Sequence, residues 1–193
     1  MKLEKELNNF KISTDDYLLE LKDKQTIVPI QISGNKVVEI ISGNEDLSEA
    51  DGIYTSNTKL NLGIKTADCA TVCLGDGNKI GAVHVGWRGL VGDIYKNILP
   101  FFNQNNLEVY VGPHIHKFEI KKDECYDELH KKFEDSFFIY DGIKIFFDFD
   151  KALRSILPQN TIFNSRDSFS DITLPSNRRD KTMERTLTTI FFK

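Results

Sequence analysis

The sequence is poor in cysteine and has no long apolar run. It contains three cysteines, Cys69, Cys73 and Cys125, and such an odd number in a chain without an export signal argues against a disulfide framework. No apolar stretch approaches the roughly 18 residues that a membrane-spanning helix needs, and the first 12 residues carry several charges. We therefore expect a cytoplasmic protein that uses its cysteines for packing or for chemistry.

An excess of positive charge is also lacking. The 25 Lys and Arg residues are outnumbered by 29 Asp and Glu, which gives a formal net charge of −4. Long-range attraction to nucleic acid or to a membrane surface therefore has no support, and any recognition of phosphate has to be local. Five prolines are scattered along the chain without a repeat, so we expect a single domain over residues 1–193, with a segment of uncertain order at residues 1–25.

Short strand-like segments alternate irregularly with amphipathic ones. Residues 26–32 and 36–42 flank a Ser-Gly-Asn turn and predict a hairpin. Further patterns predict strands over 59–65, 70–74, 79–85, 107–111, 144–147 and 186–192, and helices over 90–104, 121–133 and 150–157. Strict alternation of strand and helix is missing, which favours an α+β fold: one layered domain with mixed β-sheets and flanking helices.

Cys69 and His84 form the most suggestive chemical pair. They lie on two predicted strands that are joined by a turn near Gly77, and opposite residues of such a hairpin are about 5 Å apart. A thiolate and an imidazole at this distance can form a nucleophile pair or supply two ligands to a metal. Composition alone favours a third interpretation, a buried free cysteine beside a core histidine.

Arginines and histidines add weaker candidates. Arg88 lies between two glycines at a predicted strand-to-helix corner, which predicts either an anion site or a surface salt bridge. Arg178 and Arg179 predict a second phosphate contact or a solvated turn. His114 and His116 lie on an extended segment and would point the same way. They can bind a metal there, although exposure at the surface is the more common arrangement.

Two motifs carry a family resemblance. The run TADCATVCLGD followed by GAVHVGWRGLVGDI resembles the YfiH-like family, long labelled multicopper polyphenol oxidase or laccase-domain proteins. The resemblance continues through 112–115 and 125–126 and, more weakly, through SNRRDKTMER, so that it covers about two thirds of the chain. It implies a Cys-His hydrolase-like α+β fold. It also implies a purine nucleoside phosphorylase with associated adenosine deamination, whose small-molecule partners are a purine nucleoside and phosphate.

The resemblance also assigns roles to residues. Cys69 and His84 match two of the family's three metal ligands, and Arg88 matches an arginine of the substrate or phosphate pocket. The third ligand, the histidine of a Gln-Val-His-Gly segment, corresponds to Ser33. A serine hydroxyl is a poor substitute for imidazole, so a weakened zinc site is expected, with copper less favoured. Two alternatives remain open: a metal-free Cys-His amidase or deamidase, and a ligand-binding family member without activity.

Overall fold

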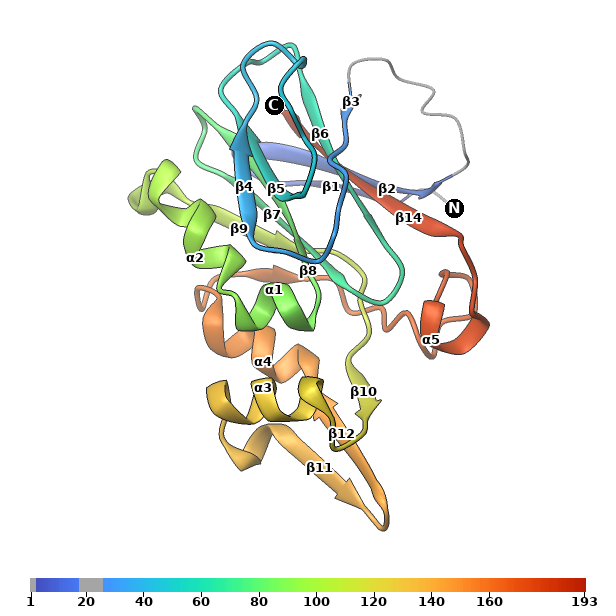
Figure 1. Ribbon diagram of the computed structural model, residues 1–193. Coiled ribbons are helices and arrows are strands. Elements are labelled where there is room, and N and C mark those ends of the chain that lie inside the picture. The colour runs from blue at the N-terminus through green and yellow to red at the C-terminus, as the bar shows by residue number, and fades with distance from the viewer. Residues whose placement is uncertain (1–2, 18–25) are drawn as a thin grey trace.

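The computed structural model describes residues 3–17 and 26–193 (Figure 1). Of the N-terminal segment 1–25, residues 1–2 and 18–25 lie outside the described residues. The remainder forms two antiparallel strands, β1 (Leu3–Glu6) and β2 (Phe10–Tyr17). These strands join a five-stranded sheet in the order β1-β2-β14-β6-β3, with β3 at Thr26–Ile27, β6 at Asn61–Thr66 and β14 at Arg185–Phe192.

A six-stranded sheet forms the centre of the molecule. Its order is β13-β9-β7-β8-β5-β4, and its strands are β4 (Lys36–Glu39), β5 (Ala50–Thr55), β7 (Ala70–Gly75), β8 (Ile80–Val85), β9 (Glu108–Val111) and β13 (Ile162–Phe163). Strands β7 and β8 are buried along their whole length, which explains their nearly unbroken apolar sequences. They form an antiparallel hairpin whose turn contains Gly77 with a φ of +90°, so the predicted strands over 70–74 and 79–85 are confirmed.

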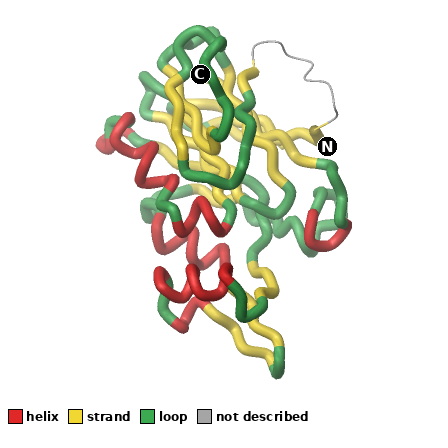
Figure 2. Tube along the Cα trace, viewed as in Figure 1, coloured by secondary structure: helices red, strands yellow, loops and turns green. Residues whose placement is uncertain are grey.

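Two hydrophobic clusters lie on the two faces of the central sheet. One fills the space between the two large sheets and contains Phe10, Ile53, Leu62, Cys73 and Ile190. Each Phe, Ile and Leu side chain in this cluster contributes about 1.5–3 kcal/mol through burial. The other face is covered by helices, which gather on one side of the molecule (Figure 2). The helices are α1 (Trp87–Val91), α2 (Ile94–Ile98), α3 (Glu124–Lys132) and α4 (Phe149–Ile156).

A small antiparallel sheet extends beyond the helices (Figure 1). Its order is β10-β12-β11, with β10 at Lys117–Ile120, β11 at Phe138–Asp141 and β12 at Lys144–Asp148. Short helical turns complete the fold at η1 (Leu99–Phe101), η2 (Gln104–Asn106), η3 (Asp135–Phe137) and α5 (Asn177–Asp180). The three layers of sheet, sheet and helix confirm the α+β prediction. Within the described ranges, no helix has the length and apolar character that crossing a membrane requires.

Two predicted elements are wrong. Residues 26–32 and 36–42 do not form a hairpin, because β3 pairs in parallel with β6 while β4 pairs in parallel with β5 of the other large sheet. The helix predicted over 90–104 is broken after α1 by Gly92 and by Asp93, whose φ is +57°. A left-handed residue cannot continue a right-handed helix, so the chain restarts as α2.

Candidate functional site

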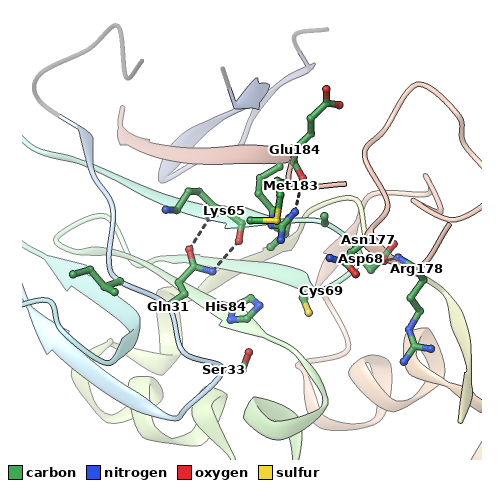
Figure 3. Close-up of a pocket in the computed structure, with 14 residues that line it drawn as sticks. Gln31, Ser33, Lys65, Asp68, Cys69, His84, Asn177, Arg178, Met183 and Glu184 are labelled. Carbon is green, nitrogen blue, oxygen red and sulfur yellow. Dashed lines mark hydrogen bonds between the residues drawn. The ribbon is translucent and has the colours of Figure 1, made fainter. Parts of the chain in front are cut away.

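A cavity of about 810 Å³ opens where the loop before β4 meets the junction of β6 and β7 and the segment around α5 (Figure 3). Cys69 and His84 both line it, as the pairing of the two side chains requires. The other lining residues are Ile30, Gln31, Ser33, Lys65, Thr66, Ala67, Asp68, Asn177, Arg178, Met183, Glu184 and Arg185. The cavity therefore combines a thiol, an imidazole, several cations and three apolar side chains.

The backbone just before Cys69 is held in an uncommon conformation. Asp68 has a φ of +86°, in the left-handed region that costs a non-glycine residue about 1–3 kcal/mol. Its buried carboxylate compensates by accepting hydrogen bonds from the Ser168 hydroxyl and the Arg178 amide, both at 2.8 Å. These contacts fix the direction in which the chain enters β7, and so they place the Cys69 side chain at the cavity.

The pairing of Cys69 with His84 differs in register from the prediction. The turn lies where it was expected, but in the β7–β8 ladder His84 is opposite Thr71 and the ladder begins at Ala70 and Val85, so Cys69 has no partner in it. Cys69 precedes the ladder and reaches the imidazole past Gly86. A Cβ atom added to Gly86 would lie 3.1 Å from the Cys69 Sγ and 3.9 Å from Cε1 of His84. The missing side chain of Gly86 thus leaves the space that the thiol occupies.

Asp51 orients His84 from the side away from the cavity opening. Its carboxylate Oδ1 lies 2.7 Å from Nδ1 of His84, and the Asp51 side chain is fully buried. Because the carboxylate can only accept, Nδ1 carries the proton and Nε2 is the nitrogen available to Cys69. The resulting order of carboxylate, imidazole and thiol is the one that activates a cysteine nucleophile.

The electrostatics of the site favour a cationic imidazole. Burial lowers the pKa of His84, but the hydrogen bonds that the ring makes to Asp51 and with Cys69 outweigh this effect and raise the pKa to about 9. Burial likewise raises the pKa of Asp51, whereas the hydrogen bond with His84 and those from backbone amides bring it below its ordinary value. The pair is therefore ionised at neutral pH.

Three consecutive backbone amides hold the other side of the Asp51 carboxylate. The amides of Ile32, Ser33 and Gly34 donate to it at 3.1, 3.0 and 2.7 Å. Ser33 has a φ of +64°, which lets successive N–H groups converge on one anion. Sequence reasoning missed Asp51. The available signal was a lone carboxylate, between Ala50 and Gly52, in a segment that is otherwise apolar.

The predicted arginines are distributed over different environments. Arg178 lines the Cys69–His84 cavity, but Arg88 lines a separate cavity of about 500 Å³, where its guanidinium stacks on the Trp87 ring at 4.3 Å. The expectation that Arg88 shares a pocket with Cys69 is therefore corrected. Arg88 is already part of α1, and its guanidinium lies over the neighbouring indole. Arg178 lines both cavities.

Arg179 stabilises the loop that contains residues 168–174. Its guanidinium donates to the carbonyl oxygens of Ser168, Phe169 and Leu174 at 2.8, 2.9 and 2.7 Å, and it pairs with Asp180 at 2.6 Å. With these donors engaged, Arg179 has a structural role in place of the predicted phosphate contact. The remaining candidates also lie outside the cavity lining: Cys73 is buried between the two large sheets, and His114 and His116 lie beside Asp150.

Known proteins similar to this chain cover most of its length. The family model described as multi-copper polyphenol oxidoreductase laccase matches residues 7–193. A purine nucleoside phosphorylase of Aquifex aeolicus is 29% identical over 197 residues, covering 96% of this chain and 94% of that protein. One from Rickettsia conorii is 34% identical over 117 residues, and the match spans only 48% of its length.

Solved structures show the same fold at low sequence identity. A Neisseria meningitidis protein superposes with a TM-score of 0.84 and 19% identity, covering 100% of this chain and 99% of that one. The hypothetical protein YfiH of Bacillus licheniformis superposes with a TM-score of 0.76, also at 19% identity, over 88% of this chain and 74% of its own. These likenesses establish the architecture.

Proposed function

The chain belongs to the multi-copper polyphenol oxidoreductase laccase family, and from this premise we propose that it is a purine nucleoside phosphorylase-like enzyme. The relatives from Aquifex aeolicus and Rickettsia conorii carry the name purine nucleoside phosphorylase. The observation that carries the proposal is the common opening of Cys69 and His84 into a cavity that is also lined by cations. Its volume of about 810 Å³ lies within the usual range for small-molecule sites.

Phosphorolysis places specific demands on such a cavity. A phosphate oxygen bonds to C1′ of the ribose while the bond from C1′ to N9 breaks, and the purine keeps the electron pair and takes up a proton. Lys65 and Arg185 line the cavity and supply positive charge for the phosphate. Ile30 and Met183 are strongly exposed apolar side chains at its rim, and they suit the faces of a purine. The cationic His84 is the candidate proton donor.

The metal that the family name and the sequence motifs imply does not fit the donor set of this cavity. Catalytic zinc is normally held by three protein ligands, and here Cys69 and His84 offer two. Ser33, which the family resemblance matches to the third ligand, lines the cavity and offers only a hydroxyl. Among the described residues, no group of three His, Cys, Asp or Glu ligand atoms converges at this position. We therefore propose that the side chains of the cavity carry out the chemistry.

A second function is favoured by the Asp51–His84 hydrogen bond of 2.7 Å. In a Cys-His amidase or deamidase, the Cys69 sulfur bonds to an amide carbonyl carbon and His84 protonates the departing nitrogen, which breaks the C–N bond. Water then hydrolyses the thioester and frees the thiol. This reaction needs the orienting carboxylate and no phosphate. It therefore predicts turnover that is independent of phosphate.

The test measures the turnover of inosine and adenosine in the presence and absence of phosphate, before and after metal ions are removed by a chelator. We expect free purine base and ribose 1-phosphate from the phosphate-containing reactions, with ammonia released only if adenosine is also deaminated. His84→Gln should reduce turnover at least about a hundredfold, because it removes the proposed proton donor, and Cys69→Ala measures what the neighbouring thiol contributes. Cys125→Ser is the matched control, because Cys125 lines the other cavity. Absence of nucleoside turnover under every metal condition would refute the proposal.

Labelling of the thiols with iodoacetamide separates the second function from the first. The amidase hypothesis predicts that Cys69 reacts faster than Cys125. Only a thiolate is nucleophilic, and this hypothesis requires Cys69 to be the thiolate. It also expects His84→Gln to slow the labelling of Cys69. An unreactive Cys69 would exclude the amidase. Nucleoside binding without turnover in either assay would instead identify a ligand-binding family member.

A further inference from the structure

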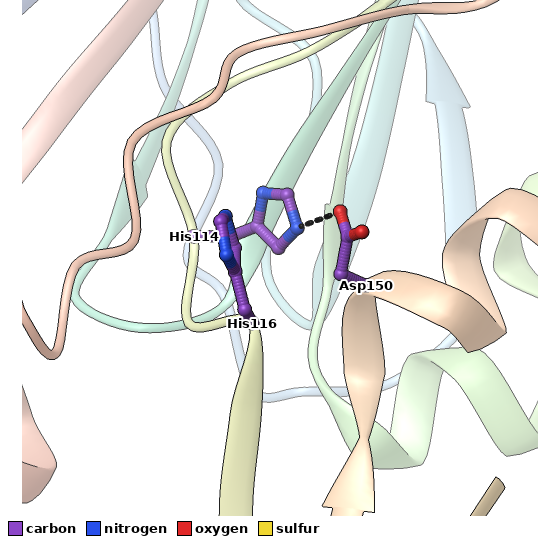
Figure 4. Close-up of side chains that lie close together, drawn as sticks. All are labelled: His114, His116 and Asp150. Carbon is purple, nitrogen blue, oxygen red and sulfur yellow. Dashed lines mark hydrogen bonds and ion pairs between the residues drawn. The ribbon is translucent and has the colours of Figure 1, made fainter.

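A second cluster of metal-ligating side chains lies where the small sheet meets α4 (Figure 4). His114 and His116 lie on the connection between β9 and β10, and Asp150 lies in the first turn of α4. One ligand atom of each residue lies within 4.8 Å of the others. Nε2 of His114 and Oδ1 of Asp150 are 3.2 Å apart. Two ligands of a tetrahedral zinc ion, with bonds of about 2.0 Å, are separated by roughly 3.3 Å.

His114 is held in the orientation that a metal ligand needs. Its Nδ1 lies 2.9 Å from the carbonyl oxygen of Gly112, and because a carbonyl can only accept, Nδ1 carries the proton. Nε2 therefore faces Asp150, as Figure 4 shows. Metal-ligating histidines in proteins commonly donate their second N–H to a carbonyl or carboxylate in this way. The His114 side chain is fully buried, so the orientation is fixed by packing as well.

His116 contributes a nitrogen that the protein leaves unused. Its Nε2 is buried and has no hydrogen-bond partner, an unfavourable state for a polar atom inside a protein. The backbone around it is firmly tied, because the His116 amide donates to Asp167 at 3.2 Å and the Asp150 amide donates to the His116 carbonyl at 2.9 Å. A bound cation would satisfy the nitrogen without any rearrangement of these segments.

Asp150 presents one carboxylate oxygen to His114. This Oδ1 lies 3.2 Å from Nε2 of His114, and the carboxylate also forms an ion pair with Arg154. Arg154 binds mainly Oδ2, with its Nε at 2.7 Å, so that Oδ1 remains directed at the imidazole. Two imidazoles and one carboxylate form a donor set that suits zinc, with a water as the fourth ligand.

We propose that His114, His116 and Asp150 form a binding site for a divalent transition metal, best suited to Zn²⁺, that is separate from the Cys69–His84 cavity. The site has a structural link to that cavity. The amide of Ile115, between the two histidines, donates to the carbonyl of Asp68 at 2.8 Å. A metal held here would brace the strained residue that precedes Cys69. The proposal stands independently of the nucleoside chemistry proposed for the cavity.

The test titrates metal-free full-length protein with Zn²⁺ by calorimetry. A Cys69→Ser/His84→Gln background removes the donors of the first cavity, and we expect it to bind one zinc ion. Adding His116→Gln or Asp150→Asn to this background should weaken binding at least about tenfold, which is the cost of losing even an outer-shell partner. Arg154→Gln is the matched control, since it removes the ion pair of Asp150 and leaves all three ligands in place, so binding should persist.

X-ray absorption at the zinc edge identifies the ligands independently of affinity. We expect the bound zinc to have nitrogen and oxygen neighbours and no sulfur in the Cys69→Ser/His84→Gln double variant. We expect the same neighbours in the natural sequence at one equivalent of zinc. If the double variant fails to fold, the natural sequence and its His116→Gln variant supply the same comparison. Sulfur in the first shell at one equivalent, no zinc binding, or undiminished binding by His116→Gln would each overturn the proposal.

Discussion

Asp51→Asn is the substitution that probes the candidate site most directly. The carboxylate accepts four hydrogen bonds: Oδ1 from Ser33 and His84, and Oδ2 from Ile32 and Gly34. An amide of the same shape has one accepting oxygen, so two of the four donors lose their acceptor. Hydrogen bonds to a charged group contribute about 1.5–3 kcal/mol each. We expect the free energy of unfolding to fall by about 3 kcal/mol, the lower end of the sum, because the loop is only half-buried.

Urea denaturation followed by the fluorescence of Trp87, the single tryptophan, measures this loss. For a chain of this size it corresponds to roughly 6–12 °C in melting temperature. Asp46→Asn is the control: its carboxylate lies on the surface of the same region, and the substitution should move the melting temperature much less. A loss below about 1 kcal/mol for Asp51→Asn would refute the argument, since it would mean that the amides and His84 do not depend on a charged acceptor.

Three further predictions concern the same cavity. His84 has a raised pKa, so its stabilising contribution is complete below its ordinary pKa of about 6.5 and is lost as the pH rises through about 9. The free energy of unfolding of metal-free protein, measured by urea denaturation, should therefore fall over that range by at most about 3.4 kcal/mol, and His84→Gln should flatten the profile. Gly86→Ala places a Cβ 3.1 Å from the Cys69 sulfur on an extended backbone, so labelling of Cys69 should slow while the urea midpoint stays near wild type; unchanged labelling would contradict the geometry. Ser33→His should raise zinc affinity at least about tenfold in calorimetry, and an unchanged affinity would show that residue 33 does not face the Cys69–His84 pair.

The sequence predicts the parts of the fold whose cause is local. Strands β7 and β8 are short apolar runs on either side of a glycine turn, and both were found within a residue or two of their bounds. The predicted hairpin at 26–42 failed because turn residues do not determine which strands pair. There the turn amides bind the Asp51 carboxylate, and the two flanking segments join different sheets. No element was predicted for the segment that contains β1 and β2, because β2 pairs with β14 at the other end of the chain and β1, at the edge of the sheet, pairs with β2.

The candidate site shows the same division between local and distant causes. Cys69 and His84 were found because each lies beside a strand end or turn that the sequence marks, whereas Asp51 acts through a contact across 33 positions. Arg88 lines a different cavity from His84. Its side chain projects from α1, and closeness to His84 in the sequence does not determine that direction.

The position of Ser33 connects these observations. Asp51 is held by the backbone amide of residue 33 and not by its side chain, so a serine in place of the histidine that the family resemblance implies leaves undisturbed the carboxylate that orients His84. The alignment of carboxylate, imidazole and thiol therefore does not require a third ligand. A weakened metal site and the proposed Cys69–His84 pair are thus compatible in this chain. For this reason metal affinity and thiol reactivity should be measured separately, since the geometry allows one to change without the other.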